Sequence, residues 1–431
     1  MSIQKSLYIG LSGLKTNGDA LNVIGDNIAN LNTIGFKASR TVFQDILGQT
    51  LLGTFSNTSI GGGVQAASVE RMFEQGALLG TGVATDLAIA GQGFFAVEGS
   101  SIGTEGIFYT RAGQFHVDHE GFLVNPSSLR LQGYTVKSDG TIGSSLGDIN
   151  IDDVPFPPAA SSTVDMVINL DAEADIDANP FDPLEPNDTS AFAAGVTLYD
   201  PQGKSYPADV YFQKTASNQW EYFVVVDGKN LEGGVEGDGA VVAQGTLQFT
   251  LDGKLDSDVQ TVGPVFQPKG GAVQAIVFDF GKSIADGGTG ADATTQYAAK
   301  SATSSIFNDG AQAGSFQNLN IDAEGRVVGH YSNGRERLIA QVTLARFKSN
   351  TGLRSQGYGL FVETSRSGTP TYGAPGAGGR GNIRSGSLEQ STVDLANEFT
   401  RMIVTQRGYQ ANGRSIATAN EMLMEVMNLK R

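Results

Sequence analysis

The sequence predicts a multidomain protein in which an α-helical coiled-coil domain, built from both chain ends, is combined with all-β inner and outer domains. Both ends carry apolar residues at a seven-residue spacing, which is typical of helices that pack along a narrow seam. The chain between them consists of short β-type runs separated by glycine-rich turns. The segments follow the order helix, β, linker, β, linker, β, connector, helix. This palindromic order predicts a nested, discontinuous arrangement.

We therefore expect the chain to leave the helical part, pass outward through the β domains and return. The predicted parts are a terminal helical domain (1–32 and 383–431), connectors (33–70 and 373–382), an inner β domain (71–150 and 311–372) and an outer β domain (151–310). Residues 151–310 contain 24 Asp and Glu against 7 Lys and Arg. Such an excess of one charge is typical of a solvated outer domain.

The C-terminal helix is predicted from residue 388 onward. Its seam consists of residues spaced seven apart, namely Leu388, Leu395, Met402, Tyr409, Ile416 and Leu423. Phe399 and Met427 widen this stripe, and charged or polar residues fill the positions between. At ~1.5 Å of rise per residue the seam spans roughly 50 Å, which is too long and thin for the helix to fold onto a core of its own. The seam therefore requires a partner helix.

The N-terminal helix has a seam of the same period. Its residues are Leu7, Leu14, Leu21, Ile24 and Ile28, and the helical pattern ends near Gly35, a residue that can adopt the left-handed C-cap conformation. Four glycines weaken this helix by ~1 kcal/mol each relative to alanine, namely Gly10, Gly13, Gly18 and Gly25. We expect the two helices to lie side by side, and the glycines and the narrow seam favour close contact between subunits. The alternative is a helical hairpin within one globular domain.

The β regions consist of short apolar runs bounded by turn residues. The expected strands are 87–90, 94–97, 108–111, 114–117, 122–124, 131–136, 327–330, 339–347 and 359–363 in the inner domain, and 164–170, 196–199, 208–214, 220–226, 246–251 and 273–280 in the outer domain. Strands at this spacing predict a sandwich or barrel rather than alternating β and α units. Trp220, which alternates with Tyr222, is expected to anchor the outer core.

Composition argues against several classes of protein. No run of eighteen or more apolar residues is present, so we expect no membrane insertion. The first thirty residues lack a basic segment followed by an unbroken apolar core, so no cleaved signal peptide is expected. The net charge of -16 argues against nucleic acid as a partner. The absence of cysteine excludes disulfides and thiolate chemistry, and suits a cytosolic protein or one exported unfolded.

The sequence contains three motifs that resemble catalytic or ligand-binding sites, but each lacks a required residue or structural context. Residues 143–147 have the spacing of a nucleophile elbow but lie in a polar turn, and the chain has only 3 histidines. Residues 91–96 imitate a dinucleotide fingerprint but continue as a strand. Acidic residues at 171–177 alternate like calcium ligands, yet the loop lacks the required glycine. We therefore expect no enzyme, no cofactor and no metal site.

Several segments resemble the bacterial flagellar rod and hook family of axial proteins. Residues 29–37, which include Asn30, Thr33, Gly35, Phe36 and Lys37, resemble the family's N-terminal motif. Other resembling segments are 91–95, 109–113 and 131–134 for the first β domain, 198–203 and 210–212 for the outer domain, 327–333 for the return to the inner domain, and 388–395 with 405–412 for the C-terminal motif. The large insertion at 151–310 favours the hook proteins of this family over its shorter rod proteins.

The resemblance implies a structural subunit that polymerises into a helical tube outside the cell and acts as a flexible universal joint, transmitting torque from rod to filament. It implies that the terminal helical domain forms the polymer core and self-associates through the seam residues. It also implies contacts with a distal rod protein, a hook cap protein and a hook–filament junction protein. It also implies export through the flagellar type III apparatus without a cleaved signal peptide. The alternatives are a rod subunit of the same family and, in a different class, a secreted β-rich binding protein or enzyme oligomerised by its terminal helices.

Overall fold

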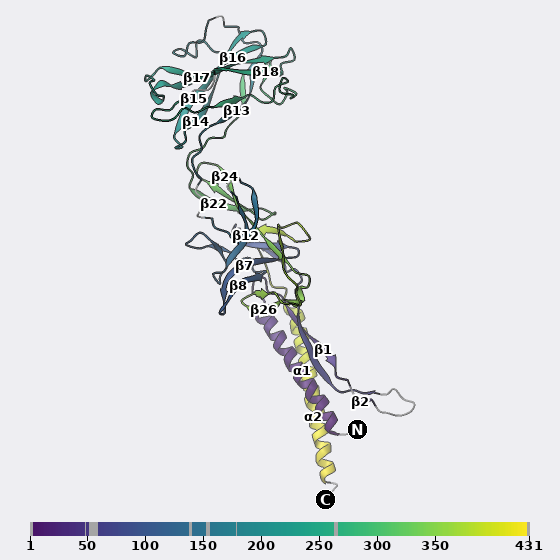
Figure 1. Ribbon diagram of the computed structural model, residues 1–431. Coiled ribbons are helices and arrows are strands. Elements are labelled where there is room, and N and C mark those ends of the chain that lie inside the picture. Colours follow the sequence, from purple (N-terminus) through teal and green to yellow (C-terminus); the bar gives the residue numbers. More distant parts are fainter. Residues whose placement is uncertain are drawn as a thin grey trace. The chain divides into compact units, whose positions relative to one another are not determined.

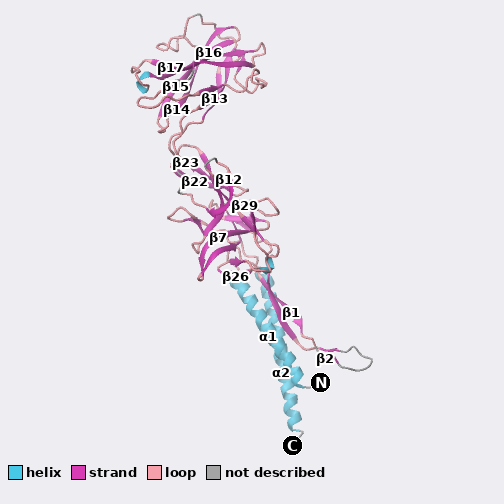
Figure 2. Cartoon of the chain, viewed as in Figure 1, coloured by secondary structure: helices cyan, strands magenta, loops and turns pink. Residues whose placement is uncertain are grey.

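The chain folds into two compact units, each with its own interior. A computed structural model describes residues 3–47, 49–50, 59–137, 140–151, 156–177, 179–262 and 266–428. Unit 1 comprises Met1–Val154, Gln317–His330 and Glu336–Arg431, and unit 2 comprises Pro155–Phe316 and Tyr331–Arg335. Across the described ranges the secondary structure is mostly β-strand, with one long helix toward each chain end (Figure 2). The predicted combination of terminal helices with β-rich regions is confirmed.

The two helices of unit 1 pack against each other. Helix α1 spans Ile3–Ala29 and helix α2 spans Leu395–Asn428. They run antiparallel, so the start of α1 and the end of α2 lie at the same end of the pair (Figure 1). Contacts along the pair agree with this direction. Gly10 lies against Ile416, and the later residue Gly18 faces the earlier residue Tyr409. The prediction that both chain ends form helices lying side by side is confirmed.

Asp394 determines where α2 begins. Its Oδ1 accepts hydrogen bonds from the Ala396 N–H at 2.9 Å and the Asn397 N–H at 3.1 Å, two of the amides that a helix N-terminus leaves without partners. The predicted helical start at Leu388 is therefore wrong. Leu388 lies in strand β30 (Ser387–Glu389), pairs with β5 (Leu78–Gly80) and is 6% exposed. A seven-residue spacing cannot distinguish a helical position from a strand position that precedes the cap.

The segment predicted as the first connector, 33–70, contains a β-hairpin. Strand β1 (Ser39–Asp45) pairs antiparallel with β4 (Val64–Arg71), and β2 (Gln49–Thr50) pairs with β3 (Ser59–Ile60). The hairpin packs along α1 (Figure 1). The prediction of an extended connector is wrong for the described part of this segment, because the hairpin is ordered by its contacts with α1.

The second predicted connector, 373–382, is bounded by strands. Strand β28 (Thr371–Gly373) ends at its first residue, and β29 (Asn382–Ser385) begins at its last. Because β29 pairs with β6 (Leu87–Ala90), residues 383–385 belong to a sheet and not to the predicted helical domain. The chain thus passes through two short strand pairs before it enters α2.

Most strands of unit 1 belong to one sheet. Among the described residues this sheet has 13 strands, ordered β22-β23-β24-β11-β7-β8-β27-β26 along its main path, with β9, β10, β12, β25 and β28 attached at its sides. Its remaining strands are β7 (Phe94–Ser101), β8 (Thr104–Thr110), β9 (His116–Val117), β10 (Leu123–Val124), β11 (Arg130–Val136), β12 (Ile142–Asp148), β22 (Phe316–Ile321), β23 (Arg326–Tyr331), β24 (Glu336–Val342), β25 (Leu344–Arg346), β26 (Arg354–Gly357) and β27 (Leu360–Val362). A 3₁₀ turn, Asn350–Gly352, precedes β26.

Aromatic side chains fill the core of unit 1 next to the root of the hairpin. Phe73, which follows β4, packs edge to face on Phe94 and Phe361, with ring centroids 5.6 and 5.4 Å away. The hydroxyls of Tyr109 and Tyr372 lie 2.7 Å apart in the same cluster, and burial raises the pKa of both tyrosines. The cluster anchors the hairpin and the first strands to one rigid base.

Unit 2 contains two sheets around one apolar core. An antiparallel meander consists of β14 (Phe192–Tyr199), β15 (Ser205–Ala216), β16 (Gln219–Asp227), β17 (Gly239–Phe249) and β18 (Leu255–Val262). In the second sheet β13 (Thr163–Asp171) pairs with β19 (Val277–Asp279), β20 (Thr295–Tyr297) and β21 (Ala302–Asn308). A 3₁₀ turn, Gly228–Asn230, follows β16. Trp220 is fully buried in this core, which confirms its predicted role as an anchor.

Many predicted strands are confirmed within their bounds, including 87–90 in β6, 131–136 in β11 and 220–226 in β16. Others are shorter than expected. Of the predicted strand 273–280, for example, Val277–Asp279 is observed as a strand. Apart from these corrections to its connectors and helical part, the finer four-part division of the chain stays a prediction. None of the described helices is long and apolar enough to cross a membrane.

Candidate assembly site

The helix pair is packed closely because α1 has glycine where α2 approaches. A Cβ built on Gly10 would lie 2.8 Å from Ile416 Cγ1, and one on Gly13 would lie 2.6 Å from Asn412 Oδ1. Glycine thus permits a backbone approach that alanine would obstruct. Gly10 and Gly13 thus serve the antiparallel pair within one chain, in agreement with the alternative that the sequence left open. The expected contacts of the glycines between subunits stay a prediction.

The predicted seam residues differ in burial within the single chain. Ile24 of α1 and Leu388 of β30 are buried. The half-buried seam residues are Leu7, Leu14, Leu21, Ile28, Met402, Ile416 and Leu423. The exposed ones are Leu395, Phe399 and Tyr409. Most of the predicted residues are therefore at least partly covered within the single chain, and three remain on its surface.

Apolar side chains remain exposed on the outer faces of both helices. On α2, Leu395, Phe399 and Ile403 lie four residues apart on one face, with exposed fractions of 39%, 47% and 53%. On α1, Tyr8 and Leu11 are 71% and 56% exposed. Contiguous exposed apolar side chains of this kind are typical of association surfaces. Their part in a polymer interface stays a prediction.

The buried Asn27 ties the hairpin to α1. Its amide nitrogen donates to the Ser39 carbonyl at 2.8 Å, and its Oδ1 accepts from the Ser39 N–H at 2.9 Å. Farther along the hairpin, Ser12 Oγ accepts from the Val64 N–H at 3.1 Å. One face of α1 thus holds the hairpin while another packs on α2, which leaves only its outer face for other contacts.

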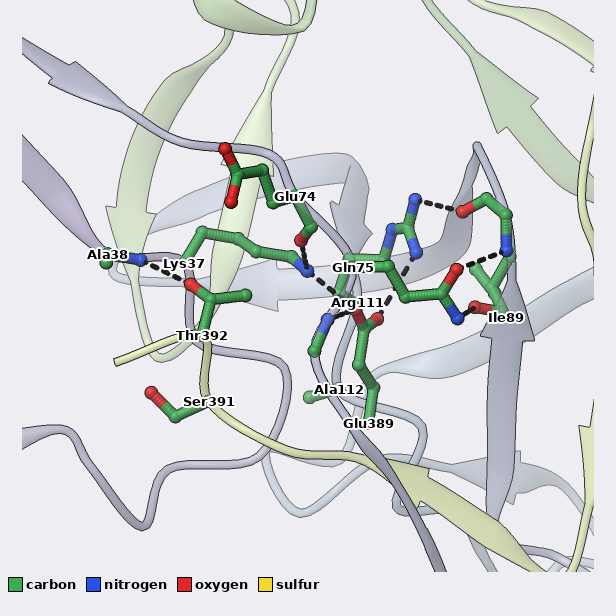
Figure 3. A network of polar contacts seen from close by, with 12 residues as sticks. Lys37, Ala38, Glu74, Gln75, Ile89, Arg111, Ala112, Glu389, Ser391 and Thr392 are labelled. Carbon is green, nitrogen blue, oxygen red and sulfur yellow. Dashed lines mark hydrogen bonds and ion pairs between the residues drawn. The ribbon is translucent and has the colours of Figure 1, made fainter. Parts of the chain in front are cut away.

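A buried ion cluster, which we call the junction, lies where the chain leaves α1 and enters α2. It consists of Lys37, Arg111 and Glu389 (Figure 3). Glu389 Oε1 accepts from Lys37 Nζ at 2.6 Å and from the Gly76 N–H at 2.8 Å, and its Oε2 accepts from Arg111 Nη1 at 3.2 Å. The side chain of Glu389 is fully buried. The carboxylate therefore joins three segments that are distant in the sequence.

The junction holds two cations against one anion. Lys37 Nζ also donates to the Glu74 carbonyl, and Arg111 Nη2 donates to the Gly91 carbonyl at 2.8 Å. Burial lowers the pKa of Lys37 and that of Arg111, and the charge of Glu389 opposes both shifts. Since the carboxylate compensates both buried cations, its loss would leave two unpaired charges in the interior.

Further hydrogen bonds extend the junction to neighbouring segments. Gln75 donates to the Ile89 carbonyl at 3.1 Å, and its Oε1 accepts from the Gly91 N–H at 2.9 Å. Thr392 Oγ1 accepts from the Ala38 N–H at 2.9 Å (Figure 3). These hydrogen bonds join the segments that leave α1 and enter α2 to neighbouring strands. The arrangement is therefore suited to fixing the root of the helix pair.

Gly35 brings the family motif to the junction. It has a φ of +69°, its N–H donates to the Glu389 carbonyl at 2.8 Å, and a Cβ there would lie 2.6 Å from the carbonyl carbon of Arg111. Only glycine combines this left-handed conformation with so close a backbone approach. The prediction of a left-handed Gly35 beyond the helix end is confirmed.

The other motif residues form the turn between α1 and β1. Thr33 Oγ1 donates to Asn30 Oδ1 at 3.0 Å, and Asn30 in turn donates to the Asp26 carbonyl at 2.9 Å. The Phe36 ring lies 5.9 Å from the guanidinium carbon of Arg71. Lys37, the last residue of the motif, lies in the junction. The motif predicted from the sequence is therefore a structural turn that directs the chain from α1 into the hairpin.

Sequence reasoning did not assign roles to Arg111, Glu389 or Glu398. Glu389 follows the buried Leu388, but the other residues around it are polar or glycine, so no local pattern singles it out. Its partners carry no local signal either, because Lys37 is 352 residues away and Arg111 is 278 residues away.

Four family models match the chain. They are the "Flagella basal body rod protein" at residues 7–37, the "Flagellar hook protein FlgE/F/G D1 domain" at 88–171, the "Flagellar basal body protein FlaE D2 domain" at 169–311 and the "Flagellar basal body rod FlgEFG protein C-terminal" at 384–429. The terminal helices, the β-rich regions between them and these matches define the class as the rod and hook proteins of the bacterial flagellum.

Full-length relatives narrow this class to one family. The chain is 35% identical to the flagellar hook protein FlgE of Borreliella burgdorferi, over 99% of this chain and 100% of the relative. It is 34% identical to that of Treponema pallidum over 100% of both chains, and 32% identical to that of Salmonella typhimurium over 97% of this chain and 98% of the relative. The chain belongs to the flagellar hook protein FlgE family, and the resemblance noted from its motifs is confirmed.

The fold is also similar to that of a solved structure. The crystal structure of the Helicobacter pylori flagellar hook protein FlgE2 has a TM-score of 0.51 and 15% sequence identity, and the match covers 72% of this chain and 100% of that chain. At this identity the likeness concerns the fold alone.

Proposed function

We propose that this chain is a structural subunit of the bacterial flagellar hook and polymerises with copies of itself into a helical tube. The observation that carries the proposal is similarity to flagellar hook proteins along essentially the whole chain. The outer insertion is part of that similarity, because residues 169–311 match a flagellar D2 domain. A large insertion at this place favours a hook subunit over a rod subunit.

The helix pair is the proposed contact between subunits. After α1 and α2 have paired within the chain, Leu395, Phe399 and Ile403 still expose apolar surface. Burying such surface contributes ~25 cal/mol per Å², and the contribution repeats at every subunit. We propose that the seam residues predicted from the sequence pack as a coiled coil in the tube core. Leu388 is excepted, because β30 already buries it.

The nested four-part division belongs to the same proposal. The long helices of the core would resist twisting, whereas β domains that touch through smaller and more polar faces can slide, so bending costs little. The acidic composition of residues 151–310 supports a solvated position for the outer domain. A tube of such subunits is suited to act as a flexible joint that transmits torque from rod to filament.

The proposed location is outside the cell, as part of the flagellum. The expected partners are other copies of the chain, a distal rod protein, a hook cap protein and a hook–filament junction protein. Export is proposed to pass through the flagellar type III apparatus without a cleaved signal peptide. Support for these assignments comes from membership of the hook protein family.

Electron microscopy of the concentrated, purified full-length chain tests the proposal. A helical polymer subunit should form tubes above a critical concentration and disperse on dilution. Discrete particles at every concentration would contradict the proposal and favour a β-rich binding protein oligomerised by its helices.

A further inference from the structure

A groove of about 270 Å³ opens on unit 1 between α1, α2 and β1. Its apolar wall includes Val23 and Ile24 of α1 and Phe43 of β1, which is 47% exposed. Its polar side includes Glu398 of α2. The groove is smaller than the roughly 300–1,000 Å³ of typical small-molecule sites. Its size suits one or two protein side chains.

Two buried polar atoms of the groove residues have no hydrogen-bond partner among the described residues. Glu398 is 3% exposed, and its Oε1 accepts from Arg401 Nη1 at 3.1 Å, but its Oε2 has no donor. The hydroxyl of Thr41 likewise has no partner. A buried carboxylate oxygen without a donor is costly, and such groups are rare in folded proteins. The described part of the single chain therefore leaves one carboxylate oxygen in the groove without a hydrogen-bond donor.

We infer that a second copy of this chain supplies this donor, with Lys15 of its α1 entering the groove. Tyr8, Leu11 and Lys15 lie at positions i, i+3 and i+7 and so share the outer face of α1. Tyr8 and Leu11 are strongly exposed, and Lys15 is exposed beside them. Leu11 would cover the apolar wall of the groove, and the ammonium of Lys15 would donate to Glu398.

Arg401 lies beside the carboxylate and lines the groove, with its side chain 51% exposed. It donates to Oε1 of Glu398, whereas Oε2 has no donor among the described residues. The ammonium of Lys15 would bind Oε2 while Arg401 keeps Oε1, so that both oxygens have a donor. The added bond would be enclosed between subunits, where a charge-assisted hydrogen bond is stronger.

The two complementary surfaces lie at different places on the same helix pair. Leu11 and Val23 are twelve residues apart on α1, which corresponds to roughly 18 Å along the helix axis. A contact between two different surfaces is heterologous, and when it does not close into a ring it propagates as a helix. This inference rests on the proposed function and adds to it a specific pair of contacting residues.

Thiol cross-linking in assembled tubes tests the contact. The chain contains no cysteine, so the double variant Lys15→Cys/Arg401→Cys introduces the only two thiols. Both sites are exposed, and each subunit would carry one thiol of each contact. The long side chains of a Lys–Glu pair hold the backbones beyond the ~7 Å between Cα atoms that a disulfide can bridge. A short, flexible bismaleimide should therefore produce a ladder of covalent oligomers on a denaturing gel.

The control variant Lys15→Cys/Arg414→Cys places the second thiol at an exposed position of α2 outside the groove, and should give no ladder. Equal ladders from both variants, or tubes without a ladder, would overturn the contact and leave the hook assignment intact. Failure of the unmodified chain to form tubes would instead count against the proposed function itself.

A charge swap supplies a second and independent measurement. Lys15→Glu should raise the critical concentration for tube formation at least about tenfold, whereas Lys15→Arg should leave it close to that of the unmodified chain. Glu398→Lys alone should also impair assembly, and the double variant Lys15→Glu/Glu398→Lys should recover it. Circular dichroism checks that each variant is folded. A folded double variant that assembles no better than Lys15→Glu would refute the pairing.

Discussion

Replacement of Glu389 by glutamine should destabilise unit 1 strongly. The change keeps the shape of the side chain but removes the charge that compensates Lys37 and Arg111. The carboxylate accepts bonds from three donors, whereas a glutamine has one acceptor oxygen and turns an NH₂ group toward the remaining donors. Breaking a buried ion pair by removing one partner costs about 3–5 kcal/mol.

The magnitude translates into a large fall in melting temperature. For domains of a few hundred residues each kcal/mol corresponds to roughly 2–4 °C, so Glu389→Gln should lower the Tm of unit 1 on the order of 10 °C. The exposed pair between Arg40 and Glu70, with side chains 59% and 43% exposed, provides a matched control. Glu70→Gln makes the same chemical change at the surface and should cost no more than about 1 kcal/mol.

The two units can be followed separately in one sample. The helices belong to unit 1, so circular dichroism at the helical minimum reports its unfolding. The single tryptophan, Trp220, is buried in unit 2, so its fluorescence reports the other unit. Glu389→Gln should shift the helical transition and leave the fluorescence transition in place.

A double-mutant cycle with Lys37→Met checks the physical cause. Removing Lys37 as well as the carboxylate charge eliminates one of the two uncompensated cations, so the double variant should lose less stability than the sum of the single variants. A loss for Glu389→Gln no larger than that for Glu70→Gln, or simple additivity in the cycle, would refute the account of the junction.

Three further predictions concern backbone, assembly and pH. Gly35→Ala should destabilise unit 1 by roughly 1–3 kcal/mol because Gly35 has a positive φ. Gly25→Ala, where a Cβ would meet open space, should instead stabilise α1 by up to ~1 kcal/mol. Thermal melts that show equal effects for the two variants would contradict this. Phe399→Asp should abolish tube formation without changing the monomer Tm. The control Thr400→Asp, on another face of α2, should still assemble. Electron microscopy and sedimentation distinguish the outcomes, and tubes from Phe399→Asp would exclude that face from the interface. Burial and neighbouring carboxylates raise the folded-state pKa of Asp258 above its unfolded value, so its contribution to stability is present at acidic pH and is lost as the pH rises through the folded pKa. Asp258→Asn should therefore stabilise unit 2 at neutral pH and weaken its pH dependence, as measured by tryptophan fluorescence melts; an unchanged pH profile would contradict the assignment.

The junction has a direct consequence for assembly. It fixes the segment that leaves α1 and the segment that enters α2 to the first strands of unit 1 (Figure 3). A polymer whose subunits meet through their helix pairs transmits force through this root. Weakening the junction should therefore soften the connection between helices and β-sheet even where tubes still form.

Local patterns in the sequence determined the elements whose order is set by near neighbours. The seven-residue spacing predicted the two helices, since side chains seven apart in a helix lie on one face. Apolar runs between turns predicted strands such as 131–136 and 220–226, since alternating side chains line one face of a sheet. The left-handed Gly35 was also foreseen, because the helical pattern ends immediately before it.

Contacts between distant residues decided the rest. Leu388 keeps the seven-residue spacing yet is a strand residue, because Asp394 caps the helix after it and β5 pairs with it. The hairpin strands β1 and β4 lack a strong strand pattern in the sequence. They are ordered instead by bonds to α1, such as those of Asn27 to Ser39. A short window of sequence carries no signal for a partner hundreds of residues away. The pairing of Lys37 with Glu389 across 352 residues is therefore a property of the folded chain alone, since only packing decides which buried charges meet.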